Sequence, residues 1–444
     1  MRRSKTQLNW AFHASDGAIL DALANGQHRA SLREQFGAAA YQELAALAAR
    51  AQRVKIAGGP RVLILPGIMG SRLSAVKHRR GARAAAPAGA SQEVLWIDPE
   101  RIGMGRLKEL ILPSAESIRP MGVLLFYYAR MKLMLEIDGF DVEFFPYDWR
   151  LGIDELGTAL ASRIRDQDEP VSLIAHSMGG LIARIAAKRL PKRLVRKLIM
   201  LGTPNRGSFS PVLALRGTYP FVRKMARLDH RHSPEYLAQA VFSTFPGIYH
   251  MLPSSRRRGA VDLLDPRSWP RTGTVPDPAL LRRVAAVRRQ LAAPDSRMCH
   301  IVGINRETVV AVRRTAAGFE YGSSLNGDGS VPVALALLPK LKTYFIDESH
   351  GNLAANSRVI RAVADLLRRG STRELLRRFA PARGRLSRID DARLKLIGGG
   401  KIDWRGLSSA QRKVVLAELD GAPLTSGGPP RKGPPGRPRR VSGA

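Results

Sequence analysis

Residues 171–180 of this 444-residue chain read Val-Ser-Leu-Ile-Ala-His-Ser-Met-Gly-Gly. The apolar run up to Ala175 has the length of a buried strand, and apolar residues recur at helical spacing after Met178. Ser177 therefore lies on a turn from a predicted strand into a predicted helix, where a strained backbone exposes the hydroxyl. Gly179 leaves room for this turn, and Ala175, where glycine is usual, adds only a methyl group. We interpret Ser177 as a nucleophile; a structural turn is the alternative.

The same alternation of short apolar runs and amphipathic helices extends over much of the chain. Helical patterns are predicted for residues 122–137, 156–164 and 181–185, and an apolar run follows each of them. Short buried strands that alternate with helices indicate an α/β fold, with a mostly parallel sheet covered by helices on both faces. The predicted strands are residues 62–65, 141–145, 171–175, 197–201, 301–302 and 343–346.

A serine hydroxyl is a weak nucleophile at neutral pH, so it needs a general base and a carboxylate that orients the base. After a turn of this kind the acid and then the histidine follow the serine along the chain. Asp328 lies in the run Gly-Asp-Gly-Ser-Val-Pro, and His350 lies in Glu-Ser-His-Gly-Asn. We predict these two as acid and base. Asp347 and Glu348 are weaker candidates for the acid, and an Asp-Gly turn is the structural alternative for Asp328.

Other histidines fit the role of base less well. His250 and His300 precede Asp328 in the chain, which is the wrong order. His176 adjoins Ser177, but we expect its ring to point away from the hydroxyl and to have a structural role.

Acyl transfer also needs backbone N–H groups that stabilise an oxyanion. We predict that Met178, the residue after the nucleophile, supplies one of them. The second is expected from Ile68, in the loop Pro-Gly-Ile-Met-Gly that follows the first predicted strand. An ordinary glycine-rich turn is the alternative explanation for that loop.

The composition is globular but strongly basic, with 72 Lys and Arg against 37 Asp and Glu, a net charge of +35. Such a charge attracts polyanions, either an anionic membrane or nucleic acid, although a solvated basic surface is the simpler explanation. We find no nucleic-acid motif and no zinc spacing, so we expect no nucleic-acid partner, no metal and no cofactor. A single cysteine, Cys299, excludes an intrachain disulfide. No 18-residue apolar window occurs, so we expect a soluble cytoplasmic protein, with peripheral membrane contact as a further option.

Composition shifts along the chain suggest its domain organisation. Asp16 can cap a first helix in a helical region that ends near residue 55, and a long interval separates two of the predicted strands. Residues 75–91 have the composition of a surface insertion. The predicted units are an N-terminal helical extension (1–58), an α/β domain (59–370) with a cap or lid insertion (207–296), a basic C-terminal extension (371–421) and a disordered basic tail (422–444).

Several motifs give the chain a family resemblance. In their order they resemble a bacterial member of the lecithin:cholesterol acyltransferase-like branch of the α/β-hydrolases, over roughly residues 60–370. The most specific are Pro-Tyr-Asp-Trp-Arg (146–150) and Gly-Thr-Pro (202–204). The others are Leu-Pro-Gly-Ile-Met-Gly-Ser-Arg-Leu (65–73), Leu-Trp-Ile-Asp-Pro (95–99), Gly-Phe-Asp-Val (139–142), Gly-Asp-Gly-Ser-Val-Pro (327–332) and Ser-His-Gly (349–351).

The resemblance implies that Ser177 attacks a lipid or other acyl ester and that the acyl group then passes to an alcohol or to water. It also implies that Trp96 contacts the acyl chain. The predicted function is a serine acyl-ester hydrolase or O-acyltransferase. The alternative is a non-catalytic module on a hydrolase scaffold that binds membranes or nucleic acid through its basic surface, and charge is its only support.

Overall fold

The structure is a computed structural model that describes residues 10–54, 58–76, 92–114, 117–253, 260–382, 384–396, 400–404 and 406–407. Its centre is a six-stranded sheet in the order β11-β8-β7-β6-β1-β5, and every neighbouring pair is parallel. This confirms the predicted fold class, and each strand overlaps one of the predicted strands, although β5 ends one residue earlier than predicted. The strands are β1 (Arg61–Leu65), β5 (Asp141–Phe144), β6 (Val171–His176), β7 (Val195–Leu201), β8 (Met298–Ile304) and β11 (Lys342–Asp347).

The sheet is buried on both faces, and alternate side chains of each strand enter different cores. Leu63 and Leu65 pack in the core formed with α8 (Ile153–Gln167) and α9 (Met178–Arg189). Val62 and Ile64 pack in the core formed with α7 (Leu125–Ile137) and α16 (Ser357–Arg369). Because neither face of the strands meets water, their sequences read as continuous apolar runs.

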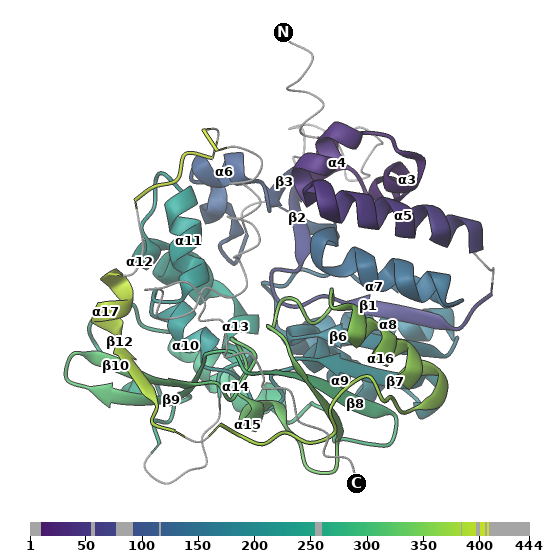
Figure 1. Ribbon diagram of the computed structural model, residues 1–444. Coiled ribbons are helices and arrows are strands. Elements are labelled where there is room, and N and C mark those ends of the chain that lie inside the picture. Colours follow the sequence, from purple (N-terminus) through teal and green to yellow (C-terminus); the bar gives the residue numbers. More distant parts are fainter. Residues whose placement is uncertain are drawn as a thin grey trace, which may run out of the picture.

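The N-terminal helices share the second of these cores. They are α2 (Trp10–His13), α3 (Asp16–Asn25), α4 (Arg29–Phe36) and α5 (Ala38–Val54), and α5 lies over α7 (Figure 1). The prediction that Asp16 caps a helix was wrong, because the Oγ of Ser15 accepts the N–H of Ala18. The Asp16 carboxylate instead contacts Arg72 at 2.7 Å and accepts the N–H of Val123. This buried contact ties the N-terminal helices to the rest of the fold.

Two antiparallel sheets were not predicted. One has the order β3-β2-β4, from β2 (Ser71–Val76), β3 (Gln92–Trp96) and β4 (Ser117–Val123). Since β4 extends to Val123, α7 begins at Leu125, three residues later than the helical pattern suggested. The predicted insertion at 75–91 begins within β2, and its residues 77–91 lie outside the described residues.

About half of the described residues between β7 and β8 lie in helices. The last of these helices, α14 (Pro278–Arg288), lies beside the parallel sheet's helices, and the carbonyl of Ala292 beyond it accepts from Arg184 of α9. In Figure 1, α10, α11 and α12 lie on the left and α13 lies near the centre. The elements before α14 are α10 (Ser210–Leu215), α11 (Pro220–Leu228), α12 (Pro234–Tyr236), η3 (Leu237–Val241), η4 (Phe242–Thr244), α13 (Pro246–His250) and η5 (Pro266–Ser268).

The second antiparallel sheet, β12-β10-β9, draws part of the predicted C-terminal extension into the fold. β12 (Ser387–Asp390) pairs with β10 (Gly318–Ser324), which pairs with β9 (Thr308–Thr315), and α17 (Asp391–Leu396) follows. The predicted tail at 422–444 lies outside the described residues. The remaining elements are α6 (Pro99–Gly103), η1 (Arg106–Leu110), η2 (Lys192–Leu194) and α15 (Val333–Ala336).

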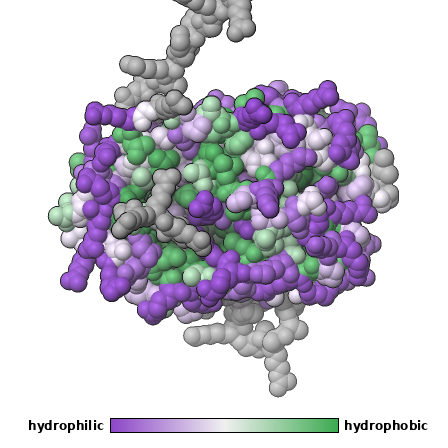
Figure 2. Space-filling model, turned by 90° about the horizontal axis from the view of Figure 1, so that it is seen from below, coloured by the Kyte–Doolittle hydropathy of each residue, from purple (hydrophilic) through white to green (hydrophobic). Residues whose placement is uncertain are grey.

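Hydrophilic residues cover much of the surface. The face in Figure 2 shows hydrophobic patches set between them. Among the helices that the structure describes, none is both long enough and apolar enough to cross a membrane.

Candidate active site

Ser177 lies on a strained turn between β6 and α9. Its backbone has φ 52° and ψ −123°, a region that residues other than glycine rarely adopt. The first residues of α9, Gly179 and Gly180, pack closely against Pro66 and Thr203. A Cβ on Gly179 would come within 2.5 Å of the Pro66 carbonyl oxygen, and one on Gly180 within 1.9 Å of Thr203 Oγ1. The two glycines after the serine are therefore steric requirements of this turn.

The structure brings Ser177, His350 and Asp328 together in one hydrogen-bonded line. Ser177 Oγ and His350 Nε2 are 2.9 Å apart, and His350 Nδ1 and Asp328 Oδ2 are 2.8 Å apart. All three side chains are buried. This arrangement of hydroxyl, imidazole and carboxylate is the one that nucleophilic serines require.

Asp328 is held rigidly by its own loop. Its Oδ1 accepts the N–H groups of Ser330 (2.9 Å) and Val331 (2.7 Å), which leaves Oδ2 for His350. The backbone carbonyl of Asp328 also accepts the N–H of His350 at 2.8 Å. Asp328 therefore has both of the roles considered for it: its Oδ1 stabilises the turn, and its Oδ2 contacts the imidazole of His350. The weaker candidates Asp347 and Glu348 bond elsewhere, and Glu348 accepts from Ser349, Asn352 and Asn356.

The predicted oxyanion donors lie on the two loops that flank Ser177. Within the parallel sheet, β5 pairs on one side of β1 and β6 on the other, so the loop after β1 and the turn after β6 lie next to each other at the carboxyl ends of the strands. Gly67 lies against the nucleophile, because a Cβ there would be 3.0 Å from Ser177 Cβ. Within the described part of the chain, the N–H groups of Ile68 and Met178 make no hydrogen bond. Both residues border Ser177 along these loops, so their N–H groups remain available as donors.

Two aromatic side chains brace the loop that carries Ile68. Tyr147 donates its hydroxyl to the carbonyl of Pro66 at 2.6 Å. Trp96 donates its indole N–H to the carbonyl of Met69 at 2.8 Å. Burial raises the pKa of Tyr147 well above its ordinary value, so this hydroxyl keeps its proton. The loop geometry next to the nucleophile is therefore fixed from outside the loop.

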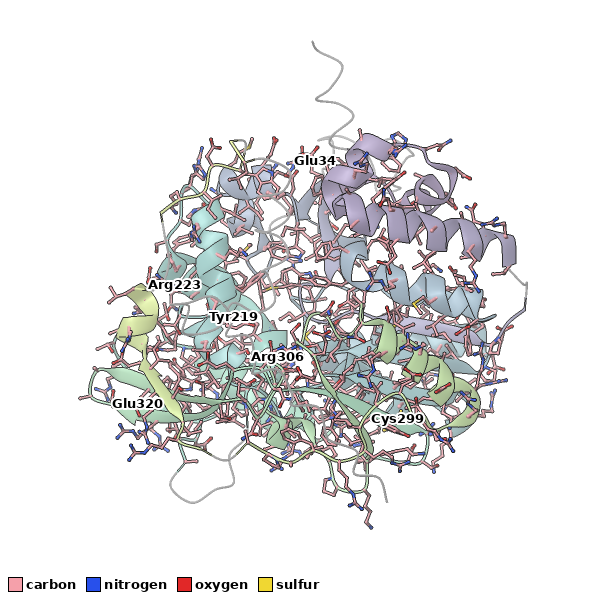
Figure 3. The ribbon with its side chains drawn as sticks, in the orientation of Figure 1. Glu34, Tyr219, Arg223, Cys299, Arg306 and Glu320 are labelled. Carbon is pink, nitrogen blue, oxygen red and sulfur yellow. The ribbon has the colours of Figure 1, made fainter. Side chains whose placement is uncertain are left out.

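A cavity of about 1000 Å³ of empty space opens beside Ser177. Trp96 lines it, and so does Tyr219, which lies at the start of α11 (Figure 3). None of the lining residues is Asp, Glu, Lys or Arg, and most are apolar. The apolar lining comes chiefly from α10, α11, α13 and the loop of residues 66–70, which we name the oxyanion loop after its predicted donor. Its apolar members include Leu124, Pro204, Pro211, Ala214, Phe221, Val222, Phe242, Ile248, Met251 and Val331.

Two further histidines near the site are neutral and hydrogen-bonded elsewhere. Burial lowers the pKa of His300 to about 3, and its Nε2 accepts the N–H of Thr203. Burial lowers the pKa of His250 to about 4, and its Nδ1 accepts the N–H of Ile153. Neither ring contacts the Ser177 hydroxyl.

Among the described residues, no cluster of three or more His, Cys, Asp or Glu side chains could hold a metal ion.

Reasoning from sequence missed several groups that shape the site. Tyr128, on α7, contacts both Gly67 and His176, but its sequence neighbourhood reads only as an amphipathic helix. The hydroxyls of Ser208 and Ser210 both donate to the carbonyl of Ser330, which ties the start of the β7–β8 interval to the loop of Asp328. No local signal identifies these contacts.

Comparison with known proteins agrees with the family resemblance. Residues 138–275 match the family model of lecithin:cholesterol acyltransferase. A search of curated proteins gives no match.

Several solved structures are similar in fold. A lipase of Bacillus licheniformis, BlEst2 in its mature form, is 14% identical and covers 70% of this chain and 93% of its own, with a TM-score of 0.35. The Tle4–Tli4 complex is 14% identical and covers 69% and 97%, with a TM-score of 0.42. The phospholipase PlaB from Legionella pneumophila is 12% identical and covers 71% and 60%, with a TM-score of 0.32. The parallel sheet is that of an α/β-hydrolase fold, and residues 138–275 are similar in sequence to the lecithin:cholesterol acyltransferase family.

Proposed function

We propose that this protein is a serine-dependent acyl-ester hydrolase or O-acyltransferase that acts on a lipid ester. The observation that carries the proposal is the hydrogen-bonded line from Ser177 through His350 to Asp328, which opens into an apolar cavity. The match to an acyltransferase family model supports the same class of reaction.

In the proposed reaction His350 Nε2 takes the proton of the Ser177 hydroxyl as Oγ attacks the ester carbonyl carbon. The N–H groups of Ile68 and Met178 stabilise the oxyanion that forms. The C–O bond of the ester then breaks, and His350 returns the proton to the departing alcohol. Asp328 keeps the proton on Nδ1 of the imidazole and stabilises the positive charge on the ring.

The acyl-enzyme is released in a second half-reaction. Water or an alcohol gives its proton to His350 and attacks the acyl carbon, and as the bond to Ser177 Oγ breaks His350 returns the proton to that oxygen. Water yields a free acid and an alcohol yields a new ester. The cavity wall favours an acyl chain because burying apolar surface stabilises the complex by about 25 cal/mol per Å², and Trp96 and Phe221 are part of this wall.

A fluorophosphonate probe tests the nucleophile directly. We expect the folded wild type to be labelled and the Ser177→Ala variant to remain unlabelled, with ester turnover lost by at least about 10³-fold. Absence of both labelling and turnover in the folded wild type would support the non-catalytic binding module instead.

A panel of lipid esters with and without alcohol acceptors separates hydrolysis from transfer. Free acid as the main product with an acceptor present indicates a hydrolase, and a new ester indicates an acyltransferase. If esters of every chain length are inert while the probe labels Ser177, the proposed substrate class is wrong.

A further inference from the structure

A chain of buried hydrogen bonds beside Ser177 joins three loops of the candidate site. The N–H of Gly67 donates to the hydroxyl of Tyr128 at 2.9 Å, and this hydroxyl is 2.9 Å from Nδ1 of His176. Nε2 of His176 is 3.0 Å from the backbone carbonyl oxygen of His350. The members come from the oxyanion loop, from α7, from the turn that bears Ser177 and from the loop after β11.

The direction of each hydrogen bond follows from the chemistry of the groups. A carbonyl oxygen only accepts, so Nε2 of His176 carries a proton and this N–H donates a hydrogen bond to the backbone carbonyl of His350. Burial, and to a lesser degree His350, lowers the pKa of His176 to about 3, so the ring is neutral and its Nδ1 is an acceptor. The Tyr128 hydroxyl therefore donates to Nδ1 and accepts from Gly67. Every polar atom in this chain thus has a defined role.

This chain of hydrogen bonds contacts the two segments that flank Ser177, the loop of His350 and the loop of Gly67. It holds the carbonyl of His350, whose N–H is already held by the carbonyl of Asp328. It also holds the N–H of Gly67, the residue before the proposed oxyanion donor Ile68. The ring centroids of His176 and His350 lie 4.9 Å apart, so the two rings pack against each other.

We propose that His176 and Tyr128 are positioning residues that set the imidazole of His350 and the oxyanion loop at their working distances from Ser177. The inference rests on the proposed function and deepens it. His176 is not a second base, because its one free lone pair, on Nδ1, accepts the Tyr128 hydroxyl while its N–H, on Nε2, donates to the carbonyl of His350. A misplacement of about 1 Å at a reacting group can cost about 10²-fold in rate.

Three variants test the proposal. His176→Leu removes the donor and the acceptor, His176→Gln keeps one of each, and Tyr128→Phe removes the hydroxyl. Tyr344→Phe is the matched control, because Tyr344 is a fully buried tyrosine whose hydroxyl has no hydrogen-bond partner among the described residues.

For each variant the fluorophosphonate end point counts competent sites, and turnover of a soluble ester is expressed per competent site. We expect His176→Leu to lower kcat per site about 10²-fold and Tyr128→Phe about 10-fold or more, with KM changed little. His176→Gln should recover much of the loss, and Tyr344→Phe should match the wild type. A residue that only stabilises the fold would reduce the number of labelled sites and leave kcat per site unchanged, and that result would overturn the proposal.

The outcomes also separate this inference from the proposed function. If the wild type is neither labelled nor active, the proposed function fails and the positioning role fails with it. If the wild type is active and His176→Leu and Tyr128→Phe retain its kcat per site, only the positioning role is wrong.

Discussion

Arg216 and Asp391 form a buried ion pair, with Nη2 and Oδ2 2.9 Å apart and side chains only 1% and 5% exposed. Asp391 also accepts from the Tyr321 hydroxyl and from the N–H of Phe319. The pair joins the end of α10, whose residues line the cavity, to α17 near the end of the described chain. This buried contact therefore links two segments that are 175 residues apart in the sequence.

Breaking this pair should destabilise the protein. Asp391→Leu leaves a buried guanidinium without its partner, and we expect a loss of about 3 kcal/mol or more in the free energy of unfolding, measured by urea denaturation. The double variant Arg216→Met/Asp391→Leu removes both charges and should recover most of the loss. Arg267→Ala is the control, because the Arg267 side chain that pairs with Asp265 is 90% exposed, and its loss should leave the midpoint unchanged. A single variant as stable as wild type would contradict the role of the pair.

Deleting different lengths of the C-terminus should have different effects. Lys401 donates to the carbonyls of Ala226, Asp229 and His232, and so holds the end of α11. Removing residues 387–444 removes Lys401, β12 and α17, and we expect a large loss in turnover of a soluble short-chain ester. Removing only residues 422–444 should leave this turnover unchanged and weaken binding to anionic vesicles. Equal turnover by both truncated proteins would show that the contacts of residues 387–404 are not needed for the site.

Gly180 and Thr203 form a steric pair beneath the nucleophile. A Cβ on Gly180 would lie 1.9 Å from Thr203 Oγ1, so Gly180→Ala should destabilise the fold by about 1–3 kcal/mol. The Thr203 hydroxyl has no hydrogen-bond partner among the described residues, and Thr203→Ala removes the atom in the way. Thermal unfolding of both single variants and the double variant should reveal a favourable coupling. Additive effects would mean that the overlap is relieved elsewhere.

Stability should fall as the pH is lowered from 7 to 5. Burial lowers the pKa of His300 to about 3 in the folded state, from an ordinary value of 6.5. The unfolded chain therefore binds more protons between these values, and stability is complete only above about pH 6.5. His300 alone should account for a loss of about 2 kcal/mol at pH 5. Urea denaturation of His300→Gln at both pH values should give a smaller pH dependence, and a dependence equal to that of the wild type would exclude this residue as its source.

The amino-acid sequence determined the parallel sheet and the positions of the main site residues along it. A strand buried on both faces has to be apolar throughout, so residues 62–65 and 171–175 are recognisable without any tertiary information. The turn at Ser177 is also local, because the small residues that allow it stand within two positions of the serine. The order of Asp328 and His350 after Ser177 follows from the chain itself.

Only the tertiary structure decided which distant groups meet. Tyr128 hydrogen-bonds to His176, 48 residues away, and Asp391 pairs with Arg216 across 175 residues. Asp16 was predicted as a helix cap because the local sequence shows only the start of a helix. The residue that Asp16 contacts, Arg72, lies on the strand β2. Hydrogen bonds, including those within ion pairs, form only between groups that the fold brings within about 3 Å of each other. Local periodicity contains no information about such contacts, and so the supports of the candidate site became visible only in three dimensions.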